Sequence, residues 1–376
     1  MIKEEHYMTT IPFVDLHAQY LSIKDEIDAA IADVISASSF IRGPHVDRFE
    51  AGFAAAIGAN HCVSCANGTD ALYIAMSALG LRPGDEVIVP AMSWISTSET
   101  VTQAGGRVVF CDIDKMTHTL DPEKLTEAMS SRTVGIIPVH LYGHPARMDR
   151  IMEIASAHGL WVLEDCAQAH LAEFQGGKVG TFGVAGTFSF YPGKNLGAMG
   201  DAGGIVTDDA ALAERMAMFA RHGGLKKHDH QIEGINSRLD GLQAAILNVK
   251  LAHLPAWTER RRALAARYGQ LLDTASGIAL PTEAGWAHHA RHIYQIRSDD
   301  RDALSRHLDA LGIRTGVNYP RALPFLPCYA EYCHIAGDFP NAHALGEQTL
   351  SLPLYPEMTE AQQDRVAEAV VNARQH

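Results

Sequence analysis

Residues 160–165 read Leu160-Trp161-Val162-Leu163-Glu164-Asp165, four apolar residues that run directly into two acids. A short apolar run bounded by polar residues is typical of a strand buried on both faces, as in a parallel sheet. In open α/β sheets, ligands bind beyond the carboxyl ends of the strands. We therefore expect the two acids at a functional edge of such a sheet, with Asp165 as a candidate site residue.

Six further runs of this kind flank that stretch and alternate with amphipathic segments. The segments 70–79 and 147–158 place their apolar residues at helical spacing. Strands that alternate with helices predict an α/β domain with a seven-stranded, mostly parallel sheet. The predicted strands are residues 62–66, 86–90, 107–113, 134–140, 160–164, 186–191 and 204–207.

The pattern changes after Arg238. A long helical stretch runs through Lys250 and past Pro255 to Leu272, and a strand at 291–297 and a helix at 301–311 follow. These elements predict a smaller α+β domain. We divide the chain into a large domain, residues 1–245, and a small C-terminal domain, residues 246–376. The amphipathic segment 23–35 fits against either domain.

Composition excludes several classes of protein. The 376 residues are 47% hydrophobic, enough for a large core, and carry a formal net charge of -13. Nucleic-acid binding rests on clustered Lys and Arg, so an acidic chain predicts no nucleic-acid partner. Residues 1–10 contain no apolar signal segment, and no later run has the length of a membrane span. We expect a cytoplasmic protein.

Two pairs of cysteines are candidate metal ligands. Cys62 and Cys65 have the spacing of a zinc or redox pair, His61 is adjacent, and Cys328 and Cys333 are the other candidates. The first pair lies in a predicted buried strand, however, and the second has a looser spacing than a zinc knuckle. The sequence therefore predicts reduced thiols and no metal site.

An anion site is one interpretation of residues 67–70, Asn67-Gly68-Thr69-Asp70, which follow the first strand and open a helix. Backbone N–H groups at a helix N-terminus bind phosphates. The other interpretation is a plain helix cap, because Asn, Thr and Asp all cap helices without a ligand.

Acid, amide and lysine follow in order along the same sheet. A buried Asp165 suits the task of holding a proton on a pyridine nitrogen, and Gln168 lies one turn further on. Lys194 follows an aromatic strand and is surrounded by glycines, so a ligand can approach it closely. A desolvated lysine there is a nucleophile towards an aldehyde, although a surface lysine in a turn has the same local sequence.

At this level of detail the chain resembles the DegT/DnrJ/EryC1/StrS sugar aminotransferases, which are fold-type I pyridoxal-phosphate enzymes. The resemblance extends over nearly the whole chain. Its motifs are long, and they occur in the family's order: Phe40-Ile41-Arg42-Gly43-Pro44, Asn67-Gly68-Thr69-Asp70-Ala71-Leu72, Pro83-Gly84-Asp85-Glu86-Val87-Ile88, Pro138-Val139-His140-Leu141-Tyr142-Gly143, Glu164-Asp165-Cys166-Ala167-Gln168-Ala169-His170, Phe188-Ser189-Phe190-Tyr191-Pro192-Gly193-Lys194-Asn195-Leu196-Gly197 and Asn236-Ser237-Arg238-Leu239-Asp240.

The resemblance implies pyridoxal 5'-phosphate as cofactor and a role for each matched residue. Lys194 corresponds to the lysine that forms the Schiff base, and Asp165 to the acid that pairs with the pyridinium nitrogen. Gln168 corresponds to the residue that bonds the ring oxygen. Trp94 falls where the family places an aromatic that stacks on the ring, and the alternative for Trp94 is a core tryptophan.

The remaining matched positions concern the phosphate and the subunit partner. Gly68, Thr69 and Ser189 correspond to residues that hold the cofactor phosphate. Asn236 corresponds to a residue that reaches the phosphate of the neighbouring subunit's cofactor, which implies a homodimer with shared sites.

Two segments bear on the substrate. Many family members carry His-Tyr-Pro near the end of the small domain, whereas this chain has Asn318-Tyr319-Pro320, so Asn318 and Tyr319 are the candidate sugar contacts. The loop after the lysine, residues 194–204, resembles that of members that aminate C3 of the sugar. Members that aminate C4 tend to have Gly-Glu-Gly-Gly there.

The resemblance implies an aminotransferase that moves an amino group from glutamate to a keto sugar nucleotide in amino sugar biosynthesis, with a 3-keto sugar linked to dTDP or UDP as the expected acceptor. Alternatives within the family are a keto-inositol aminotransferase and a 4-keto sugar nucleotide aminotransferase. A non-catalytic regulator with this fold is disfavoured by the intact Lys194, Asp165 and Gln168. A nicotinamide-dependent oxidoreductase is disfavoured because no G-x-G-x-x-G follows the first strand.

Overall fold

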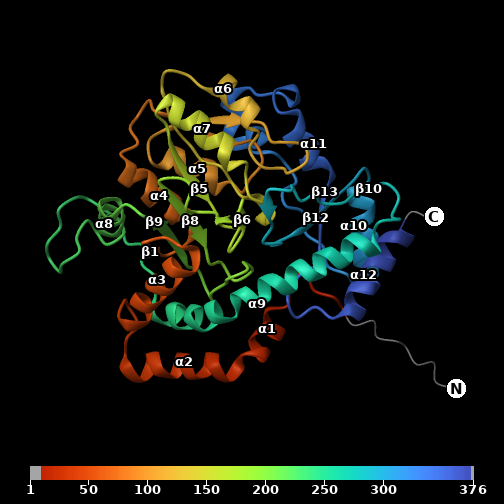
Figure 1. Ribbon diagram of the computed structural model, residues 1–376, viewed down its shortest axis with the longest axis horizontal. Helices are drawn as coiled ribbons and strands as arrows, with labels where there is room; N and C mark the ends of the chain where they lie inside the picture. Colours follow the sequence, from red (N-terminus) through yellow and green to blue (C-terminus); the bar gives the residue numbers. More distant parts are fainter. Residues whose placement is uncertain (1–9, 374–376) are drawn as a thin grey trace.

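A seven-stranded sheet forms the centre of the larger part of the molecule in the computed structural model, which describes residues 10–373 (Figure 1). The strand order is β1-β9-β8-β5-β4-β2-β3, and only β9 runs antiparallel to its neighbours. The predicted fold class is therefore confirmed. The strands are β1 (His61–Cys65), β2 (Glu86–Pro90), β3 (Arg107–Cys111), β4 (Thr133–Ile136), β5 (Trp161–Asp165), β8 (Ala185–Ser189) and β9 (Gly203–Thr207).

Three predicted strands are too long at their carboxyl ends: 107–113 and 186–191 each run two residues past β3 and β8, and 134–140 runs four residues past β4. The sequence predicts a strand over 134–140, but β4 ends at Ile136. Pro138 has no N–H to donate to a neighbouring strand, which breaks the regular ladder. The chain nevertheless stays extended beside β5, because Val139 and Asp165 form an isolated bridge.

Alternate residues of the strands enter different cores. Val87 and Val89 pack with α4 and α8, whereas Ile88 between them packs with α7 on the other face. Both faces of the sheet are thus covered by helices, which explains the continuously apolar strands. The helices of this part are α3 (Pro44–Ile57), α4 (Gly68–Leu79), α5 (Ser96–Gln103), α6 (Leu125–Ala128), α7 (Met148–His158) and α8 (Ala210–Phe219).

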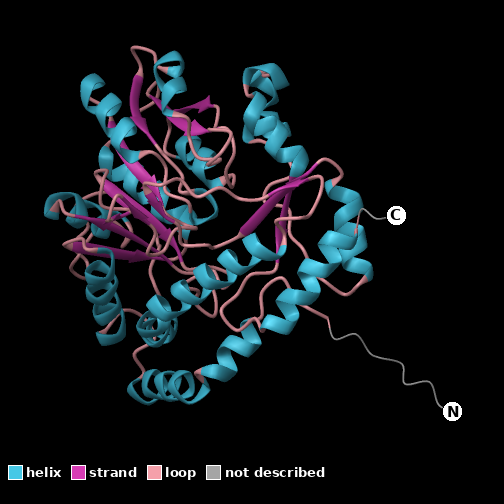
Figure 2. Ribbon diagram, turned by 45° about the vertical axis from the view of Figure 1, so that its right-hand side comes forward, coloured by secondary structure: helices cyan, strands magenta, loops and turns pink. Residues whose placement is uncertain are grey.

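A second core surrounds a three-stranded sheet of order β10-β12-β13 (Figure 2). Its strands are β10 (Ile278–Ala279), β12 (Tyr294–Ser298) and β13 (Thr349–Leu352), and its helices include α10 (Arg301–Ala310) and α12 (Glu360–Asn372). Ile11 belongs to this core and pairs with Ile313. The N-terminal segment therefore packs against residues from the far end of the chain.

Helix α9 (Gly241–Leu271) connects the two cores. Figure 1 shows it running from below the large sheet to the side of β12 and β13, and it contacts α2, α3 and α12. Pro255 lies inside α9, yet the helix continues. The division predicted between residues 245 and 246 falls within this helix, and the two-domain division stays a prediction.

The remaining elements are short or peripheral. They are α1 (Leu16–Ser22), α2 (Lys24–Ala37), α11 (Pro340–Gln348), and a small sheet of β6 (Glu173–Phe174), β7 (Gly177–Lys178) and β11 (Ala287–His288). The amphipathic segment predicted at 23–35 is α2, which packs on α9. Among residues 10–373, no helix has both the length and the apolar character that crossing a membrane requires.

Candidate active site

The two acids at the end of β5 point to opposite faces of the sheet, because side chains alternate along a strand. Asp165 accepts hydrogen bonds from the Thr97 hydroxyl at 2.8 Å and from the Ala167 N–H at 3.1 Å. Burial raises the pKa of Asp165, and the charge of Lys194 opposes this rise. A carboxyl group in this state is ready to share a proton with a basic nitrogen.

Lys194 lies in a tight loop that begins where β8 ends. Its N–H donates to the Tyr191 carbonyl at 2.8 Å. The loop closes only over a glycine at 197, since a Cβ there would lie 2.2 Å from the Pro192 carbonyl oxygen. Desolvation lowers the pKa of Lys194 to about 8, against the pull of Asp165. With this pKa, about a tenth of the amine is neutral and nucleophilic at pH 7, far more than for an ordinary lysine.

The N-terminus of α4 supplies the predicted anion cradle. The Asn67 side chain accepts from the Asp70 N–H at 2.8 Å, so the cap that the alternative interpretation requires is present. Within residues 10–373, however, no acceptor bonds the N–H groups of Gly68 and Thr69. A Cβ on Gly68 would lie 2.6 Å from the Cβ of Ser189. Cap and anion site therefore coexist, and Gly68 and Ser189 meet at the cradle.

Gln168 connects the end of β5 to the segment around residue 319. Its Oε1 accepts from the Tyr142 N–H at 2.6 Å, and its Nε2 donates to the Tyr319 hydroxyl at 3.0 Å. The Trp94 ring lies 5.5 Å from that of Tyr319, centroid to centroid, and Trp94 is 57% exposed. This exposure rules out the core interpretation of Trp94, and its stacking role stays a prediction.

A cavity of about 250 Å³ brings four of the predicted site residues together. It is lined by Gln168, Lys194, Asn318 and Tyr319, together with Phe13, Val14, Tyr191, Gly193, Arg261, His292, Ile293, Leu352 and Leu354. Residues from both cores and from the N-terminal segment thus surround the lysine. The Asn318 carbonyl accepts from the Tyr142 hydroxyl, which fixes this segment against the loop before β5.

Asn236 does not reach the cavity of its own chain. It is exposed, and its backbone forms a bridge with Arg221. The next residue, Ser237, donates to Asp70 at 2.6 Å and accepts from the Ala66 N–H at 3.0 Å. Asn236 is therefore held on the surface close to the N-terminus of α4.

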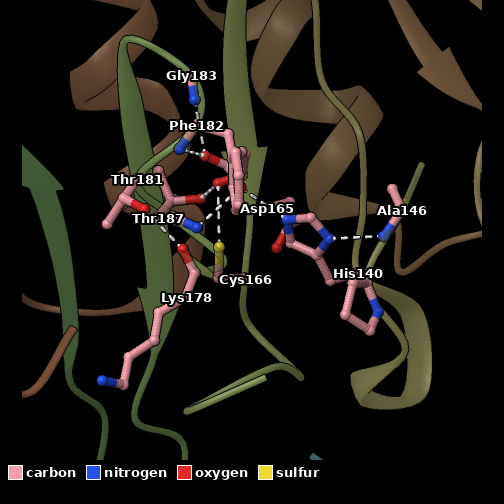
Figure 3. A network of polar contacts seen from close by, with 12 residues as sticks. His140, Ala146, Asp165, Cys166, Lys178, Thr181, Phe182, Gly183 and Thr187 are labelled. Atoms are coloured by element: carbon pink, nitrogen blue, oxygen red, sulfur yellow. Dashed lines mark hydrogen bonds and ion pairs between the residues drawn. The ribbon is translucent and has the colours of Figure 1, made fainter. Parts of the chain in front are cut away.

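On the other face, Glu164 accepts from several donors of a buried polar network, in which Figure 3 labels His140, Phe182 and Gly183. Its two oxygens accept from the N–H groups of Gly180, Phe182 and Gly183, each at 2.8 Å. The Ala146 N–H donates to Nδ1 of His140, so His140 carries its proton on Nε2 and donates it to Glu164 at 3.0 Å. The protein itself therefore supplies all four hydrogen-bond donors to the Glu164 carboxylate.

This network also bears on metal binding. Among the described residues, His140, Glu164 and Cys166 are the only group of three or more such side chains close enough to share an ion. The Glu164 oxygens are already occupied by four donors, and burial raises the pKa of the Cys166 thiol. We therefore assign the group a structural role. Cys62, Cys65, Cys328 and Cys333 do not form such a group.

Sequence reasoning missed three contributors to the site. Thr97 bonds Asp165, Tyr142 bonds Gln168, and the His140–Glu164 pair supports the strand between them. Thr97 follows the carboxyl end of β2, at the same edge of the sheet as Asp165, and this position was the available signal. The contacts of Tyr142 and His140 depend on tertiary packing, for which the sequence gives no local pattern.

Comparison with known proteins supports this picture. A model of the DegT/DnrJ/EryC1/StrS aminotransferase family matches residues 21–371. The erythromycin biosynthesis sensory transduction protein EryC1 of Saccharopolyspora erythraea is 44% identical over 95% of this chain and 97% of its own. The dTDP-3-amino-3,4,6-trideoxy-alpha-D-glucose transaminase of Streptomyces venezuelae is 44% identical over 96% and 95%. The UDP-N-acetyl-3-dehydro-alpha-D-glucosamine 3-aminotransferase of Acidithiobacillus ferrooxidans is 42% identical over 96% and 97%.

Solved structures agree with the sequence relatives. The crystal structure of DesV from S. venezuelae superimposes with a TM-score of 0.95, at 43% identity, and covers 98% of this chain and 99% of its own. NtdA from Bacillus subtilis, with the cofactor PMP bound, has a TM-score of 0.89 at 32% identity, with 99% and 86% covered. PMP is the amino form of pyridoxal phosphate, so the predicted cofactor is confirmed for the family.

Proposed function

The chain belongs to the DegT/DnrJ/EryC1/StrS aminotransferase family, and we propose that it transfers an amino group from glutamate to a 3-keto sugar linked to dTDP or UDP. The observation that carries the proposal is Lys194, an amine of lowered pKa that shares one cavity with Gln168 and Tyr319 and interacts with the charge of Asp165. Relatives at 42–44% identity named as 3-amino sugar transaminases or 3-aminotransferases support the choice of substrate.

The residues present fit pyridoxal phosphate. The free N–H groups of Gly68 and Thr69 and the hydroxyl of Ser189 would hold its phosphate at the N-terminus of α4. Trp94, with its exposed ring, would stack on the cofactor, and Gln168 would bond the ring oxygen. When bound, pyridoxal phosphate supplies an aldehyde that takes up the amino group and a ring that withdraws electrons.

The chain's own groups then provide the proton transfers. Lys194, as the neutral amine, would take the proton from the α-carbon of the amino donor and pass it to the cofactor. In the second half-reaction Lys194 would deliver a proton to the sugar carbon that receives the amino group. Asp165 holds a proton at the ring nitrogen, a task for which its buried carboxylate is placed. Donor and acceptor use the same cavity in turn, so we expect ping-pong kinetics.

A second subunit completes the site in this proposal. Asn236 is exposed, and Ser237 holds its segment beside the α4 N-terminus, which suits a contact with a partner's cofactor phosphate. Mixing Lys194→Ala chains with Asn236→Ala chains should restore part of the activity, because one site of each mixed dimer then has both residues. A monomer in solution, or verified mixed dimers without activity, would contradict the shared site.

The decisive experiment offers the holoenzyme glutamate and a panel of amino acceptors. The panel contains 3-keto and 4-keto sugars linked to dTDP and to UDP, and a keto-inositol, and NMR locates the new amine. We expect an amine on C3 of a nucleotide-linked sugar. An amine on C4, or turnover of the keto-inositol alone, would support one of the alternative enzymes. The absence of transamination with every acceptor would favour a regulator.

A further inference from the structure

A second cavity of about 480 Å³ lies away from Lys194. Its lining shares no residue with the lysine cavity. It is formed by the turn after β3, by β10 and β12, and by α11, so it lies where the large and small cores meet. The lining residues are Lys115, His118, Gly277, Ile278, Ala279, Arg297, Asp299, Asn341, Ala344, Leu345 and Gln348.

Two cations that line this cavity come from different elements and form no ion pair within the described residues. Lys115 comes from the turn after β3 and Arg297 from β12, and neither side chain makes a hydrogen bond or ion pair within residues 10–373. The third charge is Asp299, whose carboxylate accepts from Gln348 at 3.4 Å. Among the side chains that line the cavity, the two cations therefore outnumber the single acid.

Two neighbouring carboxylates, Asp112 and Asp114, are hydrogen-bonded to backbone N–H groups and not to these cations. The N-terminus of α11 is already capped, because Asp112 accepts from the N–H groups of Asn341 and Ala342 at 3.1 and 2.9 Å. Asp114 uses its carboxylate to hold the turn, accepting from Met116 and Thr117. Burial and the charge of Arg297 lower the pKa of His118 to about 4, so His118 adds no charge near neutral pH.

We propose that this cavity is a second ligand site, which binds the phosphate group of a small phosphorylated molecule through Arg297 and Lys115. A planar guanidinium can donate two parallel hydrogen bonds to a phosphate, and the Lys115 ammonium, from the turn after β3, adds a point charge. The volume is typical of small-molecule sites and exceeds what a free phosphate requires. Ile278, Ala279 and Leu345 provide an apolar wall for the organic part of the ligand.

Titration calorimetry on the holoenzyme tests the site with inorganic phosphate and phenyl phosphate as probes. We expect one site per chain outside the Lys194 cavity, with phenyl phosphate bound more tightly because its ring packs on the apolar wall. Arg297→Gln should weaken binding by about tenfold or more, and Lys115→Gln by a smaller factor. Arg306→Gln, an exposed arginine on α10, removes the same charge elsewhere in the small core and should leave binding unchanged.

Two results would overturn the proposal. One is the absence of phosphate binding to the wild-type holoenzyme, and the other is binding that both Arg297→Gln and Lys115→Gln leave unchanged. If Arg297→Gln fails to fold, as judged by circular dichroism, Lys115→Gln decides, because Lys115 lies on an exposed turn. The readout is binding alone, so the result is independent of which sugar the enzyme aminates.

Discussion

Glu164 and Asp165 are consecutive carboxylates at the end of one buried strand, yet they differ in how many hydrogen bonds they accept. Glu164 accepts four hydrogen bonds, three of them from backbone N–H groups. Asp165 accepts two, and burial raises its pKa. The first carboxylate is saturated by its own protein, whereas the second keeps acceptor capacity for something that the protein does not supply.

The same contrast separates two lysines. Desolvation lowers the pKa of both Lys194 and Lys250 to about 8. Lys250 donates to the Gly197 carbonyl at 2.8 Å and so supports the loop from behind, whereas Lys194 lines the cavity. A lowered pKa therefore does not identify a reactive group by itself. Two further observations separate the pairs: Asp165 keeps acceptor capacity that Glu164 lacks, and Lys194, unlike Lys250, lines a cavity.

The largest expected effect is on Lys194. Lys194→Ala should lower turnover by about 1,000-fold or more, because both the nucleophile and the proton carrier are lost. Borohydride reduction of the holoenzyme followed by peptide mapping should place the cofactor on Lys194. Lys250→Met should remain measurably active. Labelling of Lys250, or equal losses in the two variants, would break the distinction between the two lysines.

Asp165→Asn should have the next largest effect. We expect turnover to fall by about 100-fold or more, since an amide cannot hold the proton at the ring nitrogen. The free energy of unfolding should not fall, because burial already disfavours the charged carboxylate. Steady-state kinetics and urea unfolding of the same preparation separate the two effects. A large loss of stability with little loss of turnover would assign Asp165 to structure.

Glu164→Gln should show the opposite behaviour. The amide NH₂ cannot accept hydrogen bonds, so about two of the buried donors lose their acceptor, at a cost of about 1–3 kcal/mol each. Urea unfolding should therefore show a large decrease in stability, with the remaining folded enzyme still active. Glu153→Gln, which changes a surface pair with Arg150, is the control and should change stability by less than about 1 kcal/mol.

Much of this arrangement could be predicted from the sequence, and for a physical reason. Each strand of the large sheet is buried on both faces, so its apolar run is visible without knowledge of its neighbours. Ligands bind beyond the carboxyl ends of parallel strands, and this rule predicted a site role for Asp165. The glycines around Lys194 predicted that a ligand can approach the backbone closely. These signals are local in sequence, and the resemblance to the family added the roles.

The rest depends on contacts between distant segments. Within residues 134–140, Pro138 is a local sign that the strand stops early, but no residue there shows that His140 meets Glu164. The antiparallel direction of β9 follows from the loop after Lys194, which brings the chain back at the same edge of the sheet. The Lys115–Arg297 cavity joins segments 182 positions apart in the numbering, so no window of the sequence contains it.

The smallest effect expected concerns Thr97, whose hydroxyl is one of the two donors to Asp165. Thr97→Val keeps the shape of the side chain and removes that donor, which costs about 1 kcal/mol and lowers turnover by about fivefold. The Thr97 bond lowers the pKa of Asp165, so its loss should raise that pKa further. A carboxylate of higher pKa becomes protonated at higher pH, so the acidic limb of the pH–activity profile should shift to higher pH.

Thr100→Val is the control, because the Thr100 hydroxyl lies on the same helix but donates to a backbone carbonyl. It should leave the acidic limb in place. If both variants move the limb equally, or neither does, the hydroxyl of Thr97 does not tune Asp165, and burial alone accounts for the difference between the two carboxylates.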